Sequence, residues 1–371
     1  MIRHVNDLSL RRLAIAGLAL ILGAWLGALP GAGARASDFA SVVSGRPLVF
    51  PADTGAHPAF RTEWWYVTGW LSDEAGRERG FQVTFFRSAT GIGQDNPSRF
   101  APRQIIMAHA AIADPQTGHL LHVQRADRAL EPLAGAAVGH TRAWLGDWEL
   151  ALVDGEYRTR IAADEFGLDL GLQPPGPPVL NGDAGFSQKT PNPLNASYYY
   201  SRPHLAARGT LRLGDRAHRV TGEAWLDHEW SSEYLPEEAE GWDWIGINLH
   251  DGGSLMAFRM HRPDGSTIWS AGTLRQADGQ VEALAPEQVR FRPRRTWESP
   301  RTGAEYVVEW DLEIADRGMT LVPLMDDQEL DGRRSTGVVY WEGATRLLEG
   351  GREIGRGYLE MTGYWQRPAG L

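Results

Sequence analysis

Short strand-like segments separated by turn residues are the feature that most restricts the fold of this 371-residue chain. Clear examples span residues 81–87, 105–114, 148–154, 157–163, 255–260 and 305–314. Clusters of Gly, Asp, Asn or Pro bound most of them, as is typical of strands joined by turns. No segment has long, clean 3.6-residue periodicity, so helices should be few and short. The pattern predicts an all-β protein built from sandwiches or barrels.

The first 36 residues have the pattern of an export leader. A basic start containing Arg11 and Arg12 precedes an uncharged apolar run over residues 13–29, and the small-x-small sequence 34–36 follows. We predict a signal peptide cleaved after Ala36, and hence a periplasmic or secreted protein. The paired arginines partly resemble a twin-arginine signal. The alternative is an uncleaved anchor, although the run of 17 residues is shorter than the ~20 that span a bilayer.

The size and charge of the mature chain restrict its organisation and partners. Removing the leader leaves 371 − 36 = 335 residues, for which two domains are the default. The leader has four Arg and one Asp, so the mature net charge is −10 − 3 = −13. This acidity argues against nucleic acid and anionic membrane surfaces as partners. The chain has no Cys, which excludes disulfides and thiol chemistry.

A faint internal duplication supports two copies of one all-β unit. Residues 64–73 match residues 242–251 at an offset of 178, and residues 222–227 match residues 355–360 at an offset of 133. Chance matches between aromatic-rich strands are the alternative. The polar, acidic segment 231–241 then predicts the boundary, with a first domain over 45–230 and a second over 231–371.

Three adjacent aromatics stand in the segment FRTEWWYVTGWL, residues 60–71. Side chains alternate in a strand, so Trp64 and Trp65 must point to opposite faces. The duplicate segment keeps rings at the positions of Trp64 and Tyr66 but has Asp243 in place of Trp65. The sequence therefore predicts Trp64 and Tyr66 as barrel core, and Trp65 as an extra ring on the same face as Glu63. Asp243 is predicted to face solvent or the contact between the domains.

The densest cluster of polar and aromatic residues is EAWLDHEWSSEY, residues 223–234. In a strand, Asp227 and Glu229 share one face, and His228 and Trp230 share the other. If the second face lines a barrel, His228 is an ionisable group in an apolar, Trp-walled space and is suited to general acid–base chemistry. The alternative is a histidine that is hydrogen-bonded within a core and has no catalytic role.

Other kinds of site have less support. The histidines show no HExxH spacing, so no metal site is predicted, and the absence of a GxSxG motif argues against an α/β-hydrolase. Residues 172–203 hold seven Pro and resist strand assignment, which favours a lid or flap. Lys189, the only Lys of the chain, lies in this segment. A genomic preference for Arg is the alternative to a functional role.

Several motifs in order identify a family resemblance that spans roughly residues 45–370. They are HPAFRTEWWYVTGWL, AHAAIAD, GEAWLDHEWSS, GWDWIGINL, YWEGA and GRGYLEMTGY. Together they resemble the carotenoid 1,2-hydratase-like (AttH-like) secreted proteins. The resemblance implies two tandem lipocalin-like antiparallel β-barrels with few short helices, and a site in the first.

The hydratase members of that family add water to a terminal carbon–carbon double bond without a cofactor. Such a reaction needs an acid, a base and a wall that tolerates a carbocation, and aromatic faces stabilise cations. The hydratases carry a His-x-Trp pair that is matched here by His228 and Trp230. Their further Tyr and Asp should fall at residues 255–260, where this chain has LMAFRM. Arg259 would partly fill that place and favours a polar or anionic head group.

These observations give one leading hypothesis and one competitor. The leading hypothesis is an exported protein that binds an apolar or lipid-like molecule, and hydrates or hydrolyses it by acid–base chemistry without cofactor or metal. The predicted catalytic residues are His228, Asp227 and Glu63, and the predicted ligand-binding residues are Trp64, Trp65, Tyr66, Trp230, Arg259 and Lys189. The competitor is a carrier without turnover, or an accessory of an ABC-transporter system, as the resemblance to non-hydratase members implies.

Overall fold

The computed structural model describes residues 39–93 and 95–368, and the predicted leader therefore lies outside the described residues. Within the described part strands predominate, and the helical elements are two 3₁₀ turns, η1 (Ala52–Thr54) and η2 (Pro286–Gln288). The all-β prediction is confirmed. Each of the six strand-like segments found in the sequence lies in a strand over all of its length or all but its last residue. None of the described helices has the length and apolar character needed to cross a bilayer.

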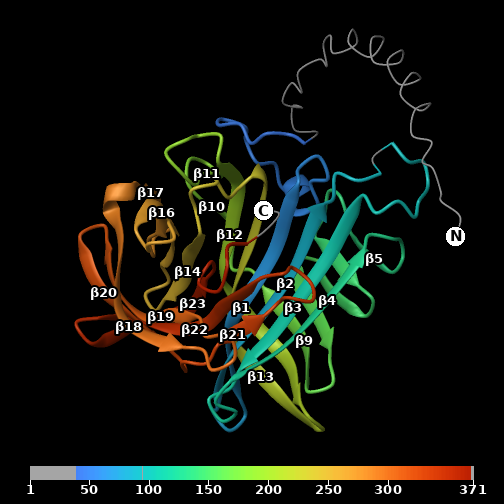
Figure 1. The fold of residues 1–371 in the computed structure, drawn as a ribbon. Coiled ribbons are helices and arrows are strands. Elements are labelled where there is room, and N and C mark those ends of the chain that lie inside the picture. Colours follow the sequence, from blue (N-terminus) through green and yellow to red (C-terminus); the bar gives the residue numbers. More distant parts are fainter. Residues whose placement is uncertain (1–38, 94, 369–371) are drawn as a thin grey trace, which may run out of the picture. The chain divides into compact units, whose positions relative to one another are not determined.

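The first sheet has thirteen strands, eleven of which follow the order β4-β3-β2-β1-β13-β12-β9-β8-β7-β6-β5 (Figure 1). β10 and β11 pair only with β12. The strands of the edges, β3 and β4 on one side and β5 and β6 on the other, contact each other, so the antiparallel sheet curls into a nearly closed barrel. The bounds are β1 (Thr62–Asp73), β2 (Glu78–Ala89), β3 (Gln104–Ala113), β4 (Leu120–Arg128), β5 (Ala134–Ala136), β6 (Arg142–Leu145), β7 (Trp148–Val153), β8 (Glu156–Ala162), β9 (Phe166–Gln173), β10 (Val179–Leu180), β11 (Phe186–Gln188), β12 (Ala196–Leu213) and β13 (Arg216–Glu233).

The second sheet has ten strands, nine of which follow the order β17-β16-β15-β14-β23-β22-β20-β19-β18. β21 pairs only with β22, and β18 contacts β15 and β16, which brings the two edges together. Both sheets fit the lipocalin-like architecture. The bounds are β14 (Gly241–Leu249), β15 (Ser254–His261), β16 (Thr267–Arg275), β17 (Val281–Leu284), β18 (Val289–Glu298), β19 (Glu305–Ile314), β20 (Arg317–Pro323), β21 (Glu329–Asp331), β22 (Val339–Glu349) and β23 (Arg352–Met361).

The duplicated segments occupy equivalent places in the two sheets. β1 lies between β2 and β13, and β14 lies between β15 and β23. The second pair of matching segments falls in β13 and β23. The chain passes from one sheet to the other between Glu233 and Gly241. The division into domains at residue 231 stays a prediction.

Both faces of β1 are buried, and this corrects one sequence prediction. Trp65 belongs to the apolar interior of the first sheet, whereas Tyr66 belongs to a cluster between the sheets with Trp225 and Trp244. The assignment of Tyr66 and its neighbour Trp64 to the barrel core was therefore wrong. The second sheet covers the outer face of β1, so that strand needs large apolar side chains on both sides.

The Pro-rich segment 172–203 is more regular than its composition suggested. It contains β10, β11 and the start of β12, which pair side by side in the first sheet. Lys189 follows β11 directly and is 1% exposed. The segment therefore places the side chain of Lys189, a cation, in the buried part of the protein.

Candidate functional site

The pairing of β1 with β13 creates two different polar sites on opposite faces of one ladder. Trp65 stands opposite His228, and Tyr66 stands opposite Asp227. Cross-strand partners share a face, and successive residues alternate. Glu63, Trp65, His228 and Trp230 therefore face the barrel interior, while Trp64, Tyr66, Asp227 and Glu229 face the second sheet.

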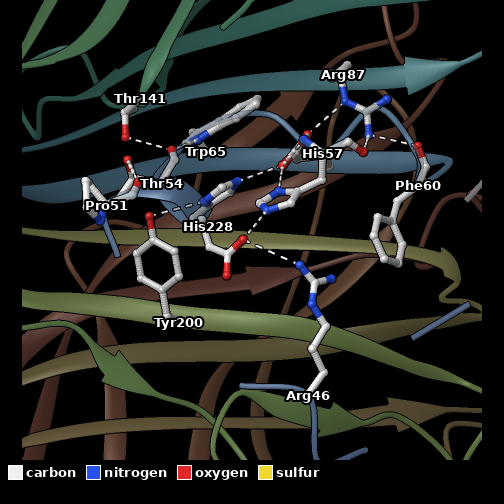
Figure 2. Close-up of polar contacts among 12 residues, drawn as sticks. Arg46, Pro51, Thr54, His57, Phe60, Trp65, Arg87, Thr141, Tyr200 and His228 are labelled. Carbon is white, nitrogen blue, oxygen red and sulfur yellow. Dashed lines mark hydrogen bonds and ion pairs between the residues drawn. The ribbon is translucent and has the colours of Figure 1, made fainter. Parts of the chain in front are cut away.

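The interior site is built around the carboxylate of Glu63, which is 0% exposed. His228 donates Nε2–H to Glu63 Oε1 at 2.9 Å, and the Nδ1 of His57 lies 2.7 Å from the same oxygen (Figure 2). Arg87 donates its Nε–H to Glu63 Oε2 at 2.8 Å. The Tyr200 hydroxyl lies 3.1 Å from the free Nδ1 of His228. Segments far apart in sequence thus converge on one carboxylate. We call Glu63, His57, His228 and Arg87 the interior cluster.

Two aromatic stacks enclose the histidines of the interior cluster. The ring of His57 stacks on Trp230 at 3.7 Å with an interplanar angle of 7°, and His228 stacks on Trp65 at 4.7 Å. The Nε2 of His57 faces Asp53 Oδ1 at 3.1 Å, so both of its ring nitrogens face carboxylate oxygens. Trp65 is thus on the same face as Glu63, as strand alternation predicted. Trp65 forms a wall of the interior cluster.

Burial alone shifts the pKa values of His228 and Glu63, at the centre of the interior cluster, in opposite directions. Burial lowers the pKa of His228 to about 4, against the hydrogen bond and charge of Glu63. Burial alone would raise the pKa of Glu63, but the hydrogen bonds from His228 and His57 and the charge of Arg87 hold it well below its usual range. At neutral pH His228 is therefore neutral and Glu63 is ionised.

The face of β1 and β13 that points to the second sheet lines a cavity of about 250 Å³. Its walls are mainly aromatic and aliphatic, and the two sheets both contribute. The lining includes Trp64, Tyr66, Phe86, Met107, Tyr234, Trp242, Trp244 and Tyr340, together with the acids Asp227, Glu229 and Glu360. We call this space the inter-sheet cavity. His228 and Trp65 do not line it.

Two carboxyls of the inter-sheet cavity have strongly raised pKa values. Burial raises the pKa of Asp227 to about 7, even though Ser201, Tyr199 and Trp225 donate hydrogen bonds to it at 2.5, 2.7 and 2.7 Å. Burial likewise raises the pKa of Glu360 to about 7, against a hydrogen bond from Trp242 at 2.7 Å. Both groups therefore change charge near neutral pH.

A third buried carboxyl stands next to Glu360. Glu342 of β22 is the direct cross-strand partner of Glu360 in β23. Burial and the charge of Glu360 raise the pKa of Glu342 well above its usual range, and the Tyr66 hydroxyl donates to it. Glu342 and Glu360 were not predicted as site residues. Their signal was an acid in the middle of each apolar motif YWEGA and GYLEM.

The single lysine neutralises the remaining acid of the inter-sheet cavity. Lys189 Nζ lies 2.7 Å from Glu229 and 4.4 Å from the ring centroid of Phe258. Burial lowers the pKa of Lys189, against the charge and hydrogen bond of Glu229. Lys189 is thus held beside the cavity by an ion pair and by aromatic faces.

Arg259 lies apart from both polar sites. Its Nε donates to Asp243 at 2.6 Å, and its guanidinium stands 4.7 Å above the ring of Trp310 inside the second sheet. Asp243 is 0% exposed, so the prediction that it faces solvent or the contact between domains is wrong. The physical reason is that the ion pair with Arg259 allows a carboxylate to replace an apolar side chain inside the sheet.

A second cavity, of about 400 Å³, is more polar. Its lining includes Trp70, His204, Glu223 and Arg356. His204 lies near Glu223, Arg356 pairs with Glu353, and the Trp70 face is covered by two arginines. His204, Glu223 and Arg356 of this lining thus already have ion-pair partners.

The fold and the polar sites define an all-β protein of two curved, lipocalin-like sheets with an aromatic, carboxyl-lined cavity between them. The chain belongs to the AttH-like family, whose model matches residues 41–364. The family prediction from the sequence motifs is thereby confirmed.

Solved structures support the same relationship. The crystal structure of a candidate AttH protein from Nitrosomonas europaea is 49% identical, over 88% of this chain and 100% of that chain, with a TM-score of 0.82. Kievitone hydratase from Nectria haematococca is 15% identical, over 87% of this chain and 95% of that chain, with a TM-score of 0.65. At that identity the second likeness shows a shared fold. No curated protein matches the chain.

Proposed function

We propose that the inter-sheet cavity binds an apolar molecule and adds water to a carbon–carbon double bond in it, by acid–base chemistry without a cofactor. The observation that carries the proposal is the pair Asp227 and Glu360. These buried carboxyls come from different sheets, line one aromatic cavity and both have a pKa of about 7.

The lining suits an apolar ligand of modest size. A volume of about 250 Å³ is below the ~300–1,000 Å³ of most ligand pockets, so a small molecule or one end of a longer chain would fit. Of the acids in the cavity wall, Glu229 is paired with Lys189, which lies beside the cavity, and burial raises the pKa of Asp227 and Glu360 to about 7. The transfer of a hydrophobic substrate from water into this cavity would therefore have a small desolvation cost.

Glu360 is the better proton donor of the pair. Among the described residues, a single side-chain hydrogen bond, from Trp242, reaches its carboxyl, and this leaves an oxygen to carry the proton. Proton transfer from Glu360 to the less substituted alkene carbon would leave a carbocation on the other carbon. The rings of Trp64, Trp242 and Tyr234 in the cavity wall would stabilise that cation.

Asp227 is the better base. Three donors point at its carboxyl, and each of them favours the ionised form. Water would attack the carbocation and lose its proton to Asp227, so that the net change is alkene plus water to tertiary alcohol. Glu360 would regain its proton from solvent, and Asp227 would release one. The two groups repel each other when both are ionised, which favours one acid and one base at neutral pH.

The proposed catalytic residues do not include His228, which was predicted as catalytic from the sequence. His228 lies in the interior cluster, and it lines neither of the two cavities described above. Asp227 is retained from the predicted set, and Glu360 is added. The predicted ligand contacts Trp64 and Tyr66 are retained with it.

The test is incubation of the purified protein with a panel of isoprenoid and phenolic alkenes in ¹⁸O-labelled water, followed by mass spectrometry. We expect a product that carries one labelled oxygen. Asp227→Asn and Glu360→Gln should each lower turnover by ~10²–10⁴-fold, the usual worth of one acid or base. The matched control is Asp169→Asn, whose carboxylate is 67% exposed. Equal turnover in all four proteins would overturn the assignment.

A carrier is the second candidate, and the neutralised Lys189–Glu229 pair favours it because the cavity then resembles a passive apolar site. Export and any association with an ABC transporter remain part of that proposal. An unaltered apolar molecule that copurifies with the wild type, together with no labelled product across the panel, would support the carrier.

A further inference from the structure

The interior cluster has no role in the proposed hydration, because it lies on the other face of β1 and β13 from the inter-sheet cavity. It nevertheless gathers groups of metal-binding type. One ligand atom from each of His57, Glu63 and His228 can be chosen so that all three lie within 4.8 Å of one another. Two imidazoles and one carboxylate are a common ligand set for first-row transition metals.

We propose that His57, Glu63 and His228 form a binding site for a divalent first-row transition metal ion, for which Zn²⁺ is the simplest probe. The ligand atoms are His57 Nδ1, Glu63 Oε1 and His228 Nε2. No sequence motif indicated this site, because the ligands come from a loop and two separate strands and lack HExxH spacing.

The outer contacts of the three ligands are those that a metal site needs. The other nitrogen of His228 faces the Tyr200 hydroxyl at 3.1 Å, and the other oxygen of Glu63 accepts from Arg87 at 2.8 Å. The other nitrogen of His57 faces Asp53 at 3.1 Å. Partners of this kind fix the ring orientation and leave the inner atom directed at the metal.

The two ring nitrogens of His57 supply an independent reason to expect a cation. Both face carboxylate oxygens, Glu63 Oε1 and Asp53 Oδ1, and neither oxygen of an ionised carboxylate can donate. A cation between His57 and Glu63 satisfies this arrangement. A metal ion bound by His57 Nδ1 and Glu63 Oε1 would be such a cation.

The geometry needs only a small adjustment to hold the ion. The nitrogens of His57 and His228 lie 2.7 and 2.9 Å from Glu63 Oε1. Ligands at ~2.0–2.2 Å from a tetrahedral Zn²⁺ stand roughly 3.3 Å apart, so the side chains would separate by about half an ångström. His57, whose side chain is 10% exposed and which lies on the loop before β1, is the proposed ligand nearest to solvent.

The test uses the full-length protein after treatment with a chelator. Calorimetric titration with Zn²⁺ should show one site per chain, and Co²⁺ should give the visible absorption of a tetrahedral nitrogen–oxygen complex. Co²⁺ should also quench part of the tryptophan fluorescence, because Trp65 and Trp230 stack on the two histidine ligands. His57→Ala should weaken Zn²⁺ binding at least tenfold, whereas the exposed His140→Ala should not change it.

The wild type alone already decides the proposal if His57→Ala fails to fold. The proposal would be overturned if the wild type failed to bind Zn²⁺ or Co²⁺ stoichiometrically, or bound Co²⁺ without fluorescence quenching. Equal Zn²⁺ binding by His57→Ala and His140→Ala would also overturn it. Loss of metal binding without loss of labelled alcohol would leave the proposed hydration intact, since that reaction uses Asp227 and Glu360.

Discussion

Asp227 and His228 are neighbours in β13, and their side chains point into different compartments. His228 stacks on Trp65 inside the first sheet, and Asp227 lines the cavity between the sheets. The motif DHEW therefore serves two sites, because alternation in a strand separates adjacent residues. Substitutions at the two positions should have different consequences.

Stability should depend on pH through the carboxyls of the inter-sheet cavity. Burial raises the pKa of Asp227 and Glu360 to about 7, from 3.8 and 4.5. Between these values the folded state binds more protons than the unfolded state, so these groups make stability fall as pH rises from about 4 to 7. Glu360→Gln should remove the part of this fall in stability that Glu360 causes, on the order of 2–4 kcal/mol. Urea unfolding of both proteins at pH 5 and pH 8 measures it.

The expected result is a variant that gains stability relative to wild type at pH 8 and much less at pH 5. The exposed Asp169→Asn should show no such pH-dependent gain. A difference between wild type and Glu360→Gln that is the same at both pH values would contradict the raised pKa of Glu360.

Removal of the central carboxylate of the interior cluster should be costly. Glu63→Gln leaves the guanidinium of Arg87, 1% exposed, without its anion. Breaking a buried pair from one side costs about 3–5 kcal/mol, because a charge then stays buried and unpaired. Urea unfolding in the presence of a chelator measures this loss without any contribution from a metal.

The double variant Glu63→Gln/Arg87→Met is the matched control, because it removes both charges. It should recover part of the lost stability. A double variant less stable than the sum of the two single changes would show that the Glu63–Arg87 pair is not the dominant contact of either residue.

The sequence alone was enough to predict the all-β architecture. It was enough to predict only part of one of the two polar sites. Strand alternation and turn residues predicted the all-β fold, and alternation correctly placed His228 apart from Asp227. It could not show that the second sheet covers the outer face of β1, so Tyr66 was misplaced. Contacts such as Glu63 with His228, 165 residues apart, depend on the register of β1 against β13, which no local pattern encodes.

The adjacent rings Trp64 and Trp65 should separate ligand binding from stability. Trp65 is 1% exposed in the core of the first sheet, so Trp65→Ala should cost about 3–5 kcal/mol. Trp64 is only partly buried and lines the inter-sheet cavity, where its ring meets Tyr234 at 5.1 Å. Trp64→Ala should cost clearly less and weaken binding of a neutral apolar dye such as N-phenyl-1-naphthylamine.

Fluorescence titration with the dye, on protein shown to be folded by circular dichroism, measures the second effect. Trp65→Phe keeps a ring in the core and should bind the dye as wild type does. Equal dye affinity of Trp64→Ala and wild type would mean that the dye, and by extension an apolar ligand, binds elsewhere.

Lys189 should matter for stability because its partner is buried. Lys189→Met would leave the Glu229 carboxylate, 4% exposed, with a hydrogen bond from Ser197 but without its cation. The expected loss is about 3–5 kcal/mol in urea unfolding. Lys189→Met/Glu229→Gln removes both charges and should recover most of the lost stability.

The comparison is Arg160→Met, which breaks the ion pair of Arg160 with Asp169. These side chains are 71% and 67% exposed, so their pair should contribute ~0–1 kcal/mol. Similar small losses for Lys189→Met and Arg160→Met would mean that water reaches Glu229, and the low-charge cavity required for an apolar ligand would then be absent.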